Sequence, residues 1–135
     1  MPTDTDLTIG GTKRLPTMHT PVVLEAVMDY TKNPSGTDDT ATVINIPAGT
    51  TLVSLTANVE TAEGSAATFD VGDLGADNQF LSVCSANDLG CTMASVASGE
   101  AYYSTANGIT INSNTGLAAA IVRLTAMIYR SGAPD

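Results

Sequence analysis

The chain has 135 residues, of which 43% are hydrophobic, but it contains no tryptophan and only two phenylalanines and four tyrosines. A chain of this length forms one domain around one core, and this core is expected to be thin and aliphatic. Fourteen acidic residues against five basic ones give a net charge of −9. Such a charge repels a phosphate backbone or an anionic membrane surface, which argues against direct nucleic-acid or membrane binding.

Residues 1–20 combine a Gly-Gly pair and two prolines with isolated apolar residues, and they show neither helical nor strand periodicity. We interpret them as an extended N-terminal arm, with disorder as an equal alternative, and residues 21–135 as the folded domain. No N-terminal segment resembles a signal peptide, and no apolar run approaches the roughly 20 residues of a membrane-spanning helix. These features predict a soluble protein that is made in a cytoplasm.

Period-two alternation of apolar and polar residues predicts strands in the first half of the chain. One strand follows Pro21, and three more are expected over residues 41–46, 53–60 and 67–71, separated by turn-rich segments. The apolar positions expected to share a face within each of the longer strands are Leu24, Ala26, Met28 and Tyr30, then Val53, Leu55, Ala57 and Val59, then Ala67, Phe69 and Val71.

In the second half, short strands are expected at residues 80–84, 101–104 and 109–111, while residues 85–99 leave a loop, a helical turn and a weak strand open. The last apolar segment, residues 117–130, also fits a helical stripe. Its alternation from Ala118 to Ile128 and the need of neighbouring strands for a partner favour a strand. About eight strands without helical crossovers predict an all-β antiparallel sandwich or barrel and, by number, a jelly roll.

The chain offers few residues for catalysis or metal binding. The single His19 lies in the arm without a neighbouring nucleophile, so neither a Ser-His-Asp relay nor a histidine metal site is expected. Cys84 and Cys91 are too few for a zinc site, and they either stay unpaired or bridge a loop in an oxidising environment. No glycine motif for a phosphate cradle occurs. We expect no enzymatic activity and no cofactor.

An acidic turn contains Asp70, Asp73, Asp77 and Asn78. Oxygen ligands on a flexible loop suit calcium, but the spacing matches no EF-hand. We therefore interpret these side chains as solvated turn acids rather than as a metal site.

Contact with other proteins remains as the expected role, through the arm and the flank of a thin sandwich, either of which can add a strand to or clamp a neighbouring chain. The candidate interface residues are Lys13, Arg14, Leu15, His19, Tyr102 and Tyr103.

The run ATVINIPAGTTLVSLTANVETAEGSAATFDVGD and the later run EAYYSTANGITINSNTGLAAAIVRL resemble the head decoration, or cement, proteins of tailed bacteriophages over about residues 39–130. The resemblance implies a jelly-roll domain that forms a homotrimer on the outer capsid surface and bridges subunits of the major capsid protein. The alternative hypothesis is a virion adhesin or fibre-type module that binds a host glycan through Tyr102 and Tyr103. A small hydrolase on a β-sandwich is a third hypothesis.

Overall fold

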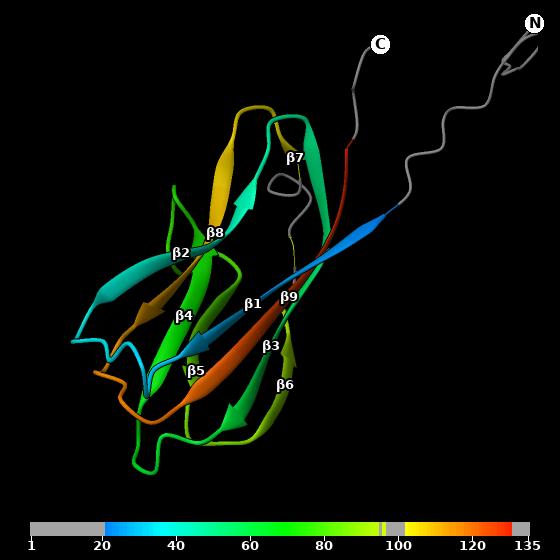
Figure 1. Cartoon of the computed structure of the whole chain (residues 1–135). Helices are drawn as coiled ribbons and strands as arrows, with labels where there is room; N and C mark the ends of the chain where they lie inside the picture. Colours follow the sequence, from blue (N-terminus) through cyan, green and yellow to red (C-terminus); the bar gives the residue numbers. More distant parts are fainter. Residues whose placement is uncertain (1–20, 95, 97–101, 131–135) are drawn as a thin grey trace, which may run out of the picture.

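The computed structural model describes residues 21–94, 96 and 102–130. Their regular structure is β-strand, arranged in two antiparallel sheets (Figure 1). No helix in this part of the chain is long and apolar enough to cross a membrane. The strands are β1 (Val22–Asp29), β2 (Asp39–Ile46), β3 (Thr50–Thr61), β4 (Thr68–Asp73), β5 (Leu81–Ser85), β6 (Gly90–Met93), β7 (Tyr102–Tyr103), β8 (Asn107–Ser113) and β9 (Ile121–Arg130).

The strand order is that of a jelly roll. Sheet I has the order β1-β9-β3-β6, with the two-residue strand β7 also paired to β3, and sheet II has the order β2-β8-β4-β5. Without β7, two four-stranded sheets remain, in which the first strand lies beside the last and the second beside the next to last. This is the double Greek-key arrangement. The prediction of an all-β sandwich is confirmed, and the strand beyond the expected eight is β6, within the segment that the sequence left open.

The core lies between the two sheets and is mainly aliphatic, as expected. Sheet I contributes the inward-facing residues of its two central strands, and sheet II contributes those of β4 and β8. The largest fully buried side chains are Tyr30, Phe69, Ile46, Leu52, Leu55, Ile109, Ile111, Leu117, Leu124, Val71, Val122 and Thr50. Burial of one such aliphatic side chain stabilises the fold by about 1.5–3 kcal/mol.

The ambiguous C-terminal segment is a strand, because β9 occupies the centre of sheet I between β1 and β3. A helix there would leave β1 without a hydrogen-bonding partner and one edge of β3 unpaired. The strand begins at Ile121 rather than at Ala118. The N–H groups of Ala118, Ala119 and Ala120 donate instead to the carboxylate of Glu63, at 2.9–3.1 Å. This contact joins the start of the β3–β4 connection to the β8–β9 connection.

Candidate interaction surface

A β-bulge in β3 turns an apolar side chain away from the core. Leu52 and Leu55 of this strand both face the core. Between them, Val53 and Ser54 lie opposite the single β9 residue Met127. Val53 therefore faces outward and is 47% exposed. The prediction that Val53 shares a face with Leu55 is wrong, because the bulge interrupts the alternation.

The bulge completes an exposed apolar patch on the outer face of sheet I. Val23 of β1 pairs with Met127 of β9, which lies beside the bulge at Val53. Tyr102 of β7 pairs with Thr51 of β3, two residues from Val53. The side chains of Val23 and Tyr102 are 56% and 51% exposed. We call Val23, Val53, Tyr102 and Met127 the apolar patch. Contiguous exposed apolar surface is typical of protein interaction sites.

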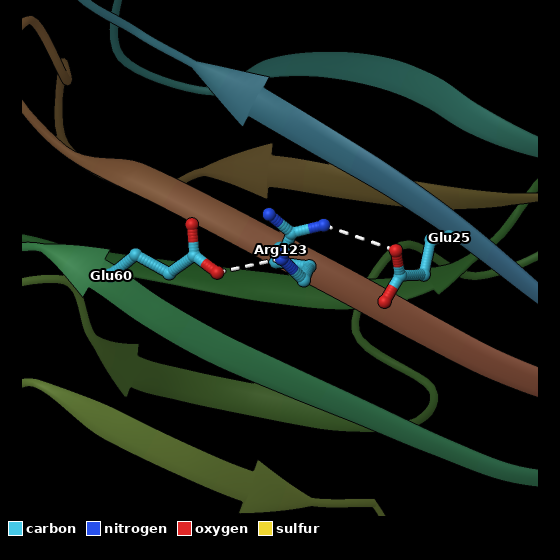
Figure 2. Close-up of polar contacts among 3 residues, drawn as sticks. All are labelled: Glu25, Glu60 and Arg123. Atoms are coloured by element: carbon cyan, nitrogen blue, oxygen red, sulfur yellow. Dashed lines mark hydrogen bonds and ion pairs between the residues drawn. The ribbon is translucent and has the colours of Figure 1, made fainter.

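A second bulge, near the other end of β3, carries an acidic residue. It lies between Val59 and Thr61, at Glu60, which faces outward. Glu60 Oε2 accepts a hydrogen bond from Arg123 Nε at 2.6 Å, and Glu25 Oε1 accepts one from Arg123 Nη1 at 3.0 Å (Figure 2). The hydrogen bond and charge of Glu60, with a smaller contribution from Glu25, raise the pKa of Arg123 above its usual value.

We call this group of Glu25, Glu60 and Arg123 the acidic triad. Its members come from the three neighbouring strands β1, β3 and β9 (Figure 2). Two carboxylates against one guanidinium leave the triad one negative charge in excess. Arg123 and Met127 lie on the same face of β9, four residues apart, which corresponds to about 13 Å along a strand. The outer face of sheet I thus has an apolar part around Met127 and, at this spacing, an acidic part around Arg123, where Val27 of β1 is also exposed.

The outer face of sheet II is polar, and the turn at residues 74–79 folds over it. A Cβ atom at Gly72 would lie 2.0 Å from the carbonyl oxygen of Ala76, so only glycine lets the turn approach this closely. Thr110, which pairs with Gly72, is 1% exposed. The turn therefore covers this face at Gly72 and Thr110, whereas Thr40 and Thr42 of β2 remain exposed.

The acids at the base of this turn are structural. Asp73, 6% exposed, accepts hydrogen bonds from the N–H groups of two turn residues and from the hydroxyl of Tyr103 at 2.8 Å. Asp70, 8% exposed, accepts from the Val83 N–H at 2.7 Å. Their interpretation as solvated acids is wrong, because the turn and β5 cover them. In the described ranges, no three His, Cys, Asp or Glu side chains are grouped so that they could hold a metal ion.

The tyrosine pair is divided between two environments. Tyr103 is buried and bonded to Asp73, whereas Tyr102 belongs to the apolar patch. The other candidate interface residues, Lys13, Arg14, Leu15 and His19, lie outside the described residues. Sequence reasoning missed most of the apolar patch and the triad. The signal for the patch was Val23 in β1 and Met127 in β9, each of which shares a strand face with charged residues.

The two cysteines are free thiols on strands of different sheets. Cys91 of β6 is exposed, and Cys84 of β5 is half-buried. Desolvation and, secondarily, the charge of Asp70 raise the pKa of Cys84. Because the thiolate is the reactive form, this environment makes Cys84 a poor nucleophile.

Three solved structures share this fold. The chain is similar to one in a cyanophage Pam1 capsid asymmetric unit, with a TM-score of 0.66, 21% identity and coverage of 91% of this chain and 97% of that one. For the capsid of Ralstonia phage GP4 the TM-score is 0.64, with 16% identity and coverage of 91% and 92%. For the acid-stable capsid of Helicobacter pylori bacteriophage KHP30 it is 0.61, with 13% identity and coverage of 83% and 90%.

The high coverage on both sides means that each matched chain is about as long as this one. No protein-family model matches the sequence, and no curated protein matches it either. At these identities the comparisons establish the jelly-roll fold.

Proposed function

We propose that this chain is a capsid decoration, or cement, protein of a tailed bacteriophage. It is made in the host cytoplasm, forms a homotrimer on the outer surface of the head and bridges subunits of the major capsid protein without catalytic activity. The observation that carries the proposal is the similarity, over nearly the whole chain, to chains of three phage capsid structures.

The lengths of the matched chains support an accessory role. Because coverage is high on both sides, a single jelly roll of this size is a complete chain in those capsid structures. A protein that binds only the assembled shell stabilises it by mass action. Several weak sites on one trimer add their effects through multivalency.

The distribution of charge and apolar surface suits an outer position. A net charge of −9 opposes contact with packaged DNA. The apolar patch and the acidic triad of sheet I provide a broad surface for contact with other protein chains. These properties are compatible with a chain that is held at the outside of a shell by protein contacts alone.

The proposal is tested with the purified full chain and empty, expanded shells that lack it. We expect a trimer in analytical ultracentrifugation, saturable co-sedimentation with the shells and a higher temperature of shell disruption. Shells that already carry the protein are the control, and they should bind no more. A monomer that leaves the disruption temperature unchanged and does not co-sediment would contradict the proposal.

The adhesin alternative loses its main structural requirement, since only one tyrosine of the pair is exposed. A depression of about 440 Å³ lies beside the 74–79 turn, but Asp73, its buried carboxylate, is already hydrogen-bonded to that turn and to Tyr103. It offers no pair of free acids for a hydrolase. Retention of a monomer on a glycan array would favour the adhesin instead.

A further inference from the structure

We infer that the outer face of sheet I receives the N-terminal segment of a second copy of this chain, with Met18 on the apolar patch and Arg14 on the acidic triad. This inference rests on the proposed function and deepens it, because it names a contact that would hold the copies together.

Charge complementarity favours this occupant. The chain has only five basic residues, and two of them are adjacent at Lys13 and Arg14. Residues 7–24 contain no acidic residue, so this stretch is positive in a chain whose net charge is −9. The acidic triad carries one unneutralised carboxylate, because Glu25 and Glu60 share Arg123. A second guanidinium there would form charge-assisted hydrogen bonds.

The spacing of the two groups also matches. Met18 and Arg14 are four residues apart, as Met127 and Arg123 are, and an extended segment places both on one face, about 13 Å apart. Pro16 lies between them and disfavours helical backbone at Leu15, the residue before it. In the extended form, Lys13 and Thr17 lie on the opposite face, away from sheet I.

Chain length argues for a second copy rather than the same one. Val22 is already part of β1 and pairs with Ile128, at the end of sheet I where β9 ends (Figure 1). For its own Met18 to cover the patch, residues 19–21 would have to reverse and rise by one layer of about 10 Å. The four Cα–Cα steps from Met18 to Val22 span at most about 14 Å, which leaves only about 4 Å for the reversal. The Met18 of a second copy is within the same distance of its own β1, so the contact requires the start of β1 in one copy to lie beside the outer face of sheet I in the next.

The contact is tested by disulfide trapping between two full-length variants, both with Cys91→Ser. One carries Met18→Cys and an affinity tag, the other carries Met127→Cys, and the mixture is oxidised mildly. We expect a mixed disulfide between the tagged and untagged chains. Thr17→Cys in place of Met18→Cys is the matched control, and it should give about tenfold less product, because its side chain points away and disulfides require close Cβ atoms.

The charged contact is tested by two variants with the same change in charge. Arg14→Glu should weaken self-association about tenfold, measured by sedimentation equilibrium, whereas Lys13→Glu should change it about twofold, because only Arg14 faces the triad. Glu60→Arg combined with Arg14→Glu should restore part of the loss. Equal effects of Arg14→Glu and Lys13→Glu would contradict the assigned face.

Other outcomes distinguish a segment of the same copy from that of a second copy, and the failure of this inference from the failure of the proposed function. A chain with both Met18→Cys and Met127→Cys that forms only an internal disulfide would show that the segment covers its own sheet, and would overturn the inference. Absence of the mixed disulfide both in solution and on shells, with shell binding intact, would overturn the inference and leave the proposed function standing. A mixed disulfide without shell binding would support the inference and contradict the proposed function.

Discussion

On sheet II, the 74–79 turn packs over Gly72 and is held by the carboxylate of Asp73. On sheet I, Val23, Val53 and Tyr102 each keep about half of their surface exposed on the outer face. The first face is covered at Gly72 by the chain's own turn, which is hydrogen-bonded to Asp73 inside the protomer. The second face presents apolar surface that folding of one chain does not cover. The 74–79 turn therefore contributes to the stability of the protomer, and the self-contact proposed above uses sheet I.

The sharpest test of this comparison uses two positions in β3 that are two residues apart. Leu55→Ala removes a core side chain with 0% exposure and should lower the free energy of unfolding by about 3 kcal/mol. Val53→Ala removes an exposed side chain and should change it by less than about 0.5 kcal/mol. Chemical denaturation of dilute protein measures both. Similar losses at the two positions would mean that the outer face of sheet I belongs to the core of the protomer.

Leu55 and Val53 also show which features of the fold can be predicted from the sequence. The alternation Leu55, Ala57, Val59 predicts a strand with one buried face, and all three side chains are buried. The same rule places Val53 with them, because a bulge adds a residue without a distinct composition. Most strands were predictable from local periodicity, whereas the orientation of a residue beside a bulge depends on the pairing with β9.

The burial of Asp70 and Asp73 was not predictable for a related reason. Aspartate in a Gly-rich turn is usually solvated. Here the turn at 74–79 folds back over β4, and the residues that cover and bond these acids include Val83 and Tyr103, which are distant in sequence. The candidate site was partly predictable at Tyr102, and otherwise required the register of three strands.

The covered face of sheet II makes a prediction of its own. Gly72→Ala would place a methyl group against the Ala76 carbonyl, 2.0 Å away, and should destabilise the fold by about 2 kcal/mol as the turn lifts. Gly75→Ala is the matched control, because its methyl group meets only the Asp73 carboxylate, at 3.3 Å. That change should be less than about 1 kcal/mol. Thermal unfolding measures the difference, and a stable Gly72→Ala variant would indicate that the turn does not pack on sheet II.

The smallest expected effect is at Glu63, whose carboxylate joins the β3–β4 connection to the β8–β9 connection. Desolvation alone would raise the pKa of Glu63, but the hydrogen bonds from the N–H groups of Ala119, Ala118 and Ala120 together outweigh it, and the pKa is lowered. The unfolded chain therefore binds this proton more readily than the folded protein. The stabilisation is complete above the ordinary value of 4.5 and is lost as the pH falls through the lowered value.

Glu63→Gln should therefore be less stable than the parent protein at neutral pH, and the difference should shrink as the medium is acidified below pH 4.5. We expect less than about 1 kcal/mol, because water screens this partly exposed carboxylate. Urea denaturation at a series of pH values measures it. Asp88→Asn removes one negative charge at an exposed position without contact to the 118–120 backbone and controls for net charge. If the two variants differ from the parent equally at every pH, the contribution comes from net charge and not from the bond that joins these connections.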